Sequence, residues 1–231
     1  MRFKGTKLSK RTVALVAAVI LLLGTGGFMG VKAAPNIVGQ NYDATIRLDE
    51  ISVQLLENGK PAAADGVLLG DLAGEAKPGW TYEENISAAN NGTAPEFVRI
   101  VVRKYWTKDG KDMELDPGLI ELKTTGKWAE NKAEATDEMS VYYCKKQLKP
   151  GDVSQLVESV RINDVVLDDK TVRSEKDGNA TIYTYTYKYD GYAFNIEAEA
   201  QGVQTHNAND AIQSIWGVSN VSASGTTLSV E

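Results

Sequence analysis

Apolar and polar residues alternate along much of the chain, with the period of two that is typical of β-strands. The clearest alternation has two arms, with apolar positions at Trp80, Tyr82, Ile86 and Ala88, then at Val98, Ile100, Val102 and Trp106. Small residues at 90–95 separate the arms, and Pro95 cannot donate a hydrogen bond to a neighbouring strand. The pattern therefore predicts two strands, the second beginning at Glu96, at the centre of a β-sandwich.

A second alternating pattern predicts a hairpin over residues 181–201. One arm carries a row of tyrosines and the other an apolar set, namely Tyr183, Tyr185, Tyr187 and Tyr189, then Phe194, Ile196, Ala198 and Ala200. Asp190-Gly191 between the arms is a typical dipeptide of a tight hairpin turn. The tyrosine row is typical of a half-exposed sheet face, and the alternative is a carbohydrate-binding strip.

Shorter patterns predict the remaining elements. Strands are expected at 119–122, at 140–144 and, with a mixed period, over most of 156–167. The Ala-, Glu- and Lys-rich segment 124–138 predicts a short helix outside the sandwich. The tail, 218–231, predicts a last strand.

A helix is predicted over 210–216, because Asn209 is a typical N-cap and Gly217 a typical stop. The apolar residues on its core-facing side are Ile212, Ile215 and Trp216. All these patterns together predict an all-β fold, a jelly-roll-like antiparallel β-sandwich with short helical insertions.

The first 33 residues have the pattern of a secretory signal. Five basic residues in 1–11 precede an unbroken apolar run at 13–23, about half of the roughly 20 residues that a membrane-spanning helix needs. Val31-Lys32-Ala33 is a small-residue cleavage pattern, so we expect cleavage between Ala33 and Ala34 and a secreted or cell-surface protein. The alternative is an uncleaved N-terminal anchor, which would be the chain's only contact with a membrane.

The new N-terminus that this cleavage creates has an alternating pattern of its own. Its apolar set is Val38, Tyr42, Ala44, Ile46 and Leu48, and after Glu50 the parity shifts to Ile51, Val53 and Leu55. Such a shift indicates a bulge or a break between two strands. Either this segment is an edge strand of its own sandwich, or it leaves and completes the sheet of a neighbour. The chain thus divides into a signal (1–33), an N-terminal donor-strand region (34–55) and a β-sandwich domain (56–231).

Charge and composition exclude several classes of function. Six of the 25 basic residues and none of the 31 acidic ones precede residue 34, which leaves 25 − 6 = 19 basic residues against 31 acidic ones. This excess of acidic residues after residue 33 argues against nucleic acid as a partner. Acidic residues at 109–116 do not have the spacing of an EF-hand loop, and a solvated loop is the preferred interpretation.

The sequence contains few candidate catalytic residues. Cys144 is the only cysteine, so it cannot form an internal disulfide and is expected to be a free structural thiol. His206 is the only histidine, which leaves no His-rich zinc site and only one candidate base for a Ser-His or Cys-His pair. We expect no catalytic, metal or cofactor site.

Several segments, taken in order, resemble the TasA/camelysin family of secreted Gram-positive envelope and biofilm-matrix proteins. The segments are 21–30 (LLLGTGGFMG), 90–93 (NNGT) followed by 97–100 (FVRI), 142–143 (YY) with 148–151 (LKPG), and 198–201 (AEAQ) with 216–217 (WG). The similarity covers most of the chain that follows the signal. The end of the signal, 27–33, lacks the aromatic-acidic sequence often found in that family.

The resemblance implies a jelly-roll subunit of extracellular fibres that assembles by donating its N-terminal strand to the next subunit. The donor residues would be Val38, Tyr42, Ala44, Ile46 and Leu48. Partners would be further copies of the chain, other matrix proteins and the envelope surface. The alternatives are a monomeric surface ligand-binding module and a camelysin-like metalloprotease. Against the metalloprotease, this sequence contains no HExxH helix.

Overall fold

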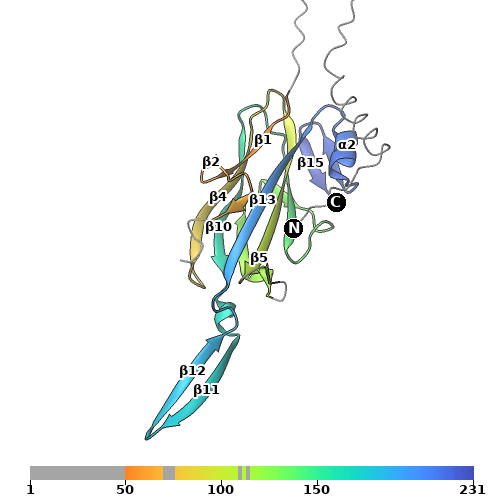
Figure 1. The fold of residues 1–231 in the computed structure, drawn as a ribbon. Helices are drawn as coiled ribbons and strands as arrows, with labels where there is room; N and C mark the ends of the chain where they lie inside the picture. The colour runs from red at the N-terminus through yellow and green to blue at the C-terminus, as the bar shows by residue number, and fades with distance from the viewer. Residues whose placement is uncertain (1–49, 70–75, 109–110, 113–114) are drawn as a thin grey trace, which may run out of the picture. The chain divides into compact units, whose positions relative to one another are not determined.

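Two antiparallel β-sheets packed face to face make up the body of the protein (Figure 1). The computed structural model describes residues 50–69, 76–108, 111–112 and 115–231. These residues all belong to one compact unit, which begins at Arg47. The predicted all-β sandwich with short helical insertions is confirmed.

Each sheet has a strand order that mixes distant parts of the chain. The first sheet has the order β2 (Lys60–Pro61), β1 (Val53–Glu57), β4 (Thr81–Asn90), β10 (Val153–Ile162) and β7 (Ile120–Thr124). The second sheet has the order β3 (Val67–Leu68), β13 (Ala193–Gln204), β5 (Glu96–Thr107), β9 (Met139–Cys144) and β8 (Trp128–Glu130), with β6 (Lys111–Asp112) pairing with β5.

The chain crosses between the sheets at most of its connections. The two arms of the first alternating pattern, β4 and β5, lie in different sheets, so the small-residue turn joins the layers instead of closing a hairpin. The second arm begins at Glu96, as predicted. Such repeated crossing brings residues far apart in sequence into one core.

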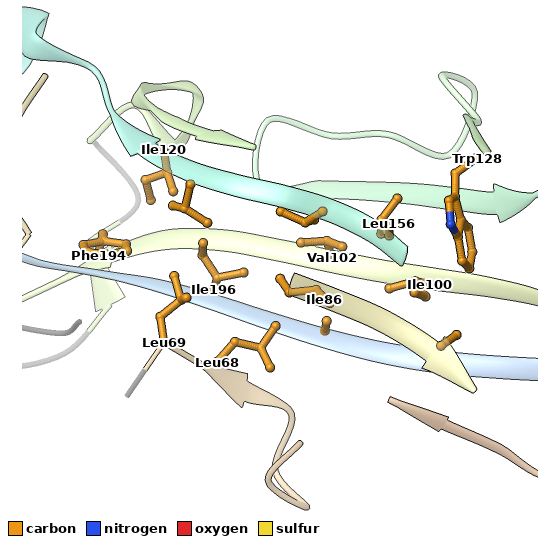
Figure 2. Close-up of a cluster of buried hydrophobic side chains, with 14 of the residues drawn as sticks. Leu68, Leu69, Ile86, Ile100, Val102, Ile120, Trp128, Leu156, Phe194 and Ile196 are labelled. Carbon is orange, nitrogen blue, oxygen red and sulfur yellow. The ribbon is translucent and has the colours of Figure 1, made fainter. Parts of the chain in front are cut away.

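The main core fills the space between the sheets. Figure 2 shows labelled side chains that converge from both layers, among them Ile86, Leu156, Ile100 and Ile196. The two tryptophans of the opening pattern differ, because Trp106 is 4% exposed and Trp80 is 60% exposed. The alternation placed Trp80 on the apolar face of the first strand, but Trp80 precedes β4 and is not a core residue.

A second apolar cluster covers the outer face of the second sheet. It is built from α2 (Ala208–Ala211), the π-helix η3 (Ile212–Trp216), and the hairpin β14 (Val221–Ser224) with β15 (Thr227–Val230). The helix and its stop at Gly217 are confirmed, but Asn209 is not the N-cap, because its side chain bonds the backbone of Ala223. The π-turn also changes the helical register, so Ile215 is exposed and not buried.

One prediction about the middle of the chain needs correction, and another can now be explained. Segment 124–138 is not a helix, because Trp128 is buried and begins the strand β8. Propensity favoured a helix there, and tertiary burial of the indole overrides it. The mixed period of 156–167 has two causes: β10 shifts register on both sides of Val157, and the 3₁₀ helix η2 (Asp164–Leu167) follows it.

The hairpin predicted over 181–201 is also wrong in its pairing. The tyrosine arm is β12 (Ala180–Tyr187), and its partner is β11 (Lys170–Asp177), joined through a turn at Gly178. The apolar arm is β13, which pairs with β5 along its whole length. The charged sequence of β11 has no apolar period, so sequence pattern could not identify it as a strand.

Candidate assembly site

The predicted donor strand and cleavage site lie outside the described residues. This applies to Ala33, Ala34, Val38, Tyr42, Ala44, Ile46 and Leu48. What the structure does describe is the place where the chain joins the sandwich and the strand edge nearest to it. These two features, with an exposed hairpin, are the candidate assembly surfaces.

The chain joins the sandwich through residues 50–52, which lie on the turn between β4 and β5. Glu50 donates its backbone N–H to Thr93 Oγ1 at 2.8 Å, and its carbonyl accepts the Thr93 N–H at 2.9 Å. The Ser52 carbonyl accepts the Asn91 N–H at 2.8 Å. The turn therefore fixes the backbone of the joining segment before β1 begins.

Two glycines give this segment its space. A Cβ at Gly92 would lie 2.2 Å from the Glu50 carbonyl oxygen. A Cβ at Gly202, on β13, would lie 2.5 Å from Glu96 Oε2 and 3.5 Å from Ile51 Cγ2. A Cβ at Gly92 would therefore collide with the backbone of the joining segment, whereas a Cβ at Gly202 would displace the buried side chain of Glu96 beneath it.

Asn90 holds the turn itself in shape. Its fully buried side chain donates to the carbonyls of Ala94 at 2.8 Å and Leu148 at 2.9 Å, and its Oδ1 accepts the N–H of Gly92 at 2.8 Å. Gly151 donates its N–H to the Asn90 carbonyl. Segments 90–93 and 148–151, which carried part of the family resemblance, thus meet at one place.

Glu96 lies beneath the joining segment and is fully buried. In the described part of the chain, neither of its carboxylate oxygens has a hydrogen-bond partner. Burial raises the pKa of Glu96 to about 7, and the nearby backbone N–H of Ser52 offsets only part of that rise. The junction therefore contains a carboxyl group that titrates near neutral pH.

Part of one edge of β13, nearest the joining segment, has no neighbour among the described strands. On the side away from β5, the one described strand that pairs with β13 is the two-residue strand β3, at Ile196 and Glu197. The Ala198 N–H donates to Gly66, so by strand alternation the N–H groups of Ala200 and Gly202 face the same way. No described strand pairs with them there, and this is the geometry that strand addition requires.

Other quoted segments meet on the outer face of the second sheet. Arg99 bonds Gln201 at 2.8 Å and the Tyr143 hydroxyl at 3.1 Å, and Tyr143 meets Trp216 edge to face at 5.4 Å. Burial, followed by the hydrogen bond to Glu134, raises the pKa of Tyr143 to about 12. This network packs the C-terminal cluster against the sandwich.

Within the residues described, we find no group of three or more His, Cys, Asp or Glu side chains that could hold a metal ion. Nor does the described part contain a helix long and apolar enough to cross a membrane. Cys144 is a buried free thiol, as expected, and its Sγ lies 3.5 Å from Ser154 Oγ.

Comparison with known protein families, with curated proteins and with solved structures finds no match. The function must therefore be argued from the chain itself. Sequence pattern indicated the turn at 90–95 but missed Glu96 and Gly202 as parts of the junction. Their only signals were a carboxylate at the start of an apolar strand and a glycine inside one, which is often a place of close approach.

Proposed function

We propose that this chain is a structural subunit of extracellular fibres in a biofilm matrix or cell envelope, with no catalytic role. Subunits join head to tail, and each places its N-terminal strand in the sheet of the next. Secretion follows from the signal pattern, and processing between Ala33 and Ala34 releases the donor strand. The partners are other copies of the chain, further matrix proteins and the envelope surface.

The single observation that carries the proposal is the part of the β13 edge that no described strand covers. Beyond β3, the N–H groups of Ala200 and Gly202 have no described strand beside them. The core face of β13 is apolar at this edge, since Ala198 is buried and Ala200 packs against the main core. An added strand would find both backbone partners and apolar contacts there.

The predicted donor segment is longer than the part of β13 beyond β3, Ala198 to Gln204, which spans roughly 23 Å, so a part of the segment is enough to fill this edge. Residues 34–48, when extended, span about 50 Å at roughly 3.3 Å per residue. Burial of Val38, Tyr42, Ile46 and Leu48 would contribute about 1.5–3 kcal/mol each before ordering costs. Main-chain hydrogen bonds along β13 add to this, so a stable polymer is expected.

Deletion of residues 34–48 from the secreted protein tests the proposal. We expect the truncated protein to elute as a monomer in size-exclusion chromatography and to show no fibres by electron microscopy. A matched pair of variants separates the apolar face from the segment itself. Tyr42→Ser with Ile46→Ser should reduce polymer yield at least tenfold, whereas Asp43→Ser with Arg47→Ser should retain it. Fibres of unchanged yield after the deletion would refute strand donation.

A further inference from the structure

The hairpin of β11 and β12 is exposed on both of its faces. Among the described strands of four residues or more, these are the two in which every residue is exposed. The tyrosine row was expected on a half-exposed sheet face, but in the structure neither face of this hairpin is buried. Exposed aromatic side chains that gather in one place often mark a binding site, and burial in the fold does not explain these.

The two faces of this hairpin differ in chemistry. Cross-strand pairing and strand alternation place three tyrosines and two lysines on one face, with uncharged residues between them. This tyrosine face consists of Lys170, Val172, Ser174, Lys176, Thr181, Tyr183, Tyr185 and Tyr187. It has no acidic residue, because Glu175 and Asp177 lie on the opposite face with Arg173. The tyrosine face is therefore positively charged in a chain that has an excess of acidic residues.

The three rings of the tyrosine face are accessible to a ligand. Tyr183, Tyr185 and Tyr187 are 59%, 54% and 37% exposed, and no described residue hydrogen-bonds to their hydroxyl groups. At about 3.3 Å per residue they form a row roughly 13 Å long. Tyr189 does not belong to this row, because its ring lies 5.0 Å from that of Trp106 and packs against the main core.

A lysine lies near each end of the row of rings. Lys170 and Lys176 are six positions apart on β11, which is roughly 20 Å. Lys170 Nζ donates to the Leu167 carbonyl at 3.2 Å and lies 5.7 Å from the centre of the Tyr187 ring. An ammonium group has three N–H donors, so Lys170 can also bind an anionic group beside this ring. The tyrosine face thus offers aromatic surface and positive charge together.

The spacing of these charges distinguishes between anionic partners. Double-stranded DNA carries one negative charge per about 1.7 Å of helix axis, and two lysines roughly 20 Å apart do not match that density. An acidic polysaccharide carries its carboxylates farther apart. Its sugar rings have apolar C–H faces and are edged with hydroxyl groups, which suit the faces and the hydroxyl groups of tyrosines.

We propose that the tyrosine face of the β11–β12 hairpin binds an extended anionic polysaccharide. Sugar rings stack on Tyr183, Tyr185 and Tyr187, and acidic groups of the polysaccharide pair with Lys170 and Lys176. This binding goes beyond the proposed function and does not require strand donation, because the hairpin contains none of the donor residues. Exposed ion pairs are weak one at a time, so binding strengthens where one polysaccharide spans several copies of the chain.

Binding of the purified protein to immobilised polygalacturonate and hyaluronate tests the proposal. The methyl ester of polygalacturonate has the same backbone without the charge and is the matched control. Soluble protein is separated from sedimented polymer before the measurement, so a failure of binding and a failure of fibre assembly are read separately. We expect binding to both acids, at least tenfold tighter for polygalacturonate than for its ester, and weaker at high salt.

Substitution of the rings tests the stacking. The triple variant Tyr183→Ser, Tyr185→Ser and Tyr187→Ser should bind both acids at least tenfold more weakly. It should keep its melting temperature, since none of these side chains is buried. The matched control, Ile182→Ser with Thr184→Ser, changes the opposite face of the same strand and should bind like the wild type.

Substitution of the lysines tests the charge without changing a ring, so it remains informative if the triple variant unfolds. Lys170→Gln with Lys176→Gln should abolish the preference for the acid over its ester, whereas Arg173→Gln, on the opposite face, should retain it. Binding to neither acid, or wild-type binding by either the tyrosine or the lysine variant, would overturn the proposal. Loss of fibres from the triple variant with unchanged polysaccharide binding would instead assign the face to contact between copies.

Discussion

Glu96 shows how a single residue couples the junction to pH. Its carboxyl group is buried between Ser52 and Gly202, without a hydrogen-bond partner among the described residues. Its backbone is nonetheless fixed, because Glu96 and Leu148 exchange N–H···O bonds of 2.9 and 2.8 Å. The side chain therefore cannot leave without disturbing β5, and the cost of its ionisation falls on the folded state.

The sign of this effect follows from the two pKa values. The ordinary pKa of 4.5 rises to about 7 in the folded protein, so between these values the folded state holds a proton that the unfolded state has lost. Stability is therefore greatest below pH 4.5, as far as this group is concerned, and falls as pH rises to about 7. Glu96→Gln should remove that fall, on the order of 1–3 kcal/mol, in thermal unfolding at a series of pH values. A wild-type pH profile unchanged by the substitution would contradict this account.

At the scale of elements, the two edges of β13 have different roles. Alternate N–H groups along it face β5 and the open side, as the bond from Ala198 to Gly66 shows. Glu199 pairs with Val101 of β5, whereas Ala200 directs its N–H away from β5. The same strand is therefore internal on one side and an edge on the other.

Substitution by proline can test the two sides separately, because each proline removes a single backbone N–H that faces one side only. Ala200→Pro should cost the fold about 1 kcal/mol and reduce polymer yield severalfold, since it removes a donor that only an added strand would use. Glu199→Pro should cost about 3 kcal/mol or more, because it breaks a bond to β5. Thermal unfolding and sedimentation of both variants provide the measurements. If Ala200→Pro polymerised like the wild type, the incoming strand would not use this edge.

At the scale of the whole molecule, net charge would oppose the proposed assembly. After cleavage at Ala33 the chain would hold 19 basic against 31 acidic residues, so every subunit repels the next. The proposed assembly must therefore depend on short-range strand and side-chain contacts, which act once the repulsion between subunits is screened.

Salt should accordingly speed polymer growth. The screening length falls from about 30 Å at 0.01 M to about 8 Å at 0.15 M salt, which shortens the repulsion between subunits. We expect the growth rate, followed by light scattering, to rise several-fold over this range. A rate that fell with salt would indicate that opposite charges across the interface dominate assembly.

Alternation of apolar residues was enough to determine β4, β5, the core face of β13 and the all-β class, because a residue's parity decides its face wherever one side of a sheet is buried. Alternation could not show which strands are neighbours. The sequence pattern predicted that the tyrosine arm pairs with β13, whereas in the structure this arm pairs with β11, which has no apolar alternation.

The tertiary structure alone decided the features on which the proposed assembly depends. Glu96 becomes a neutral-pH group only because β5 carries it under residues 50–52, and Gly202 matters only because β13 passes beside them. Trp128 became a strand residue because its indole is buried. The local pattern predicts the secondary structure and the buried face of each segment. These features, in contrast, arise from contacts between segments that are far apart in the chain. The sequence by itself thus determined the kind of layers, and only folding decided which strand edge has no neighbour among the described strands.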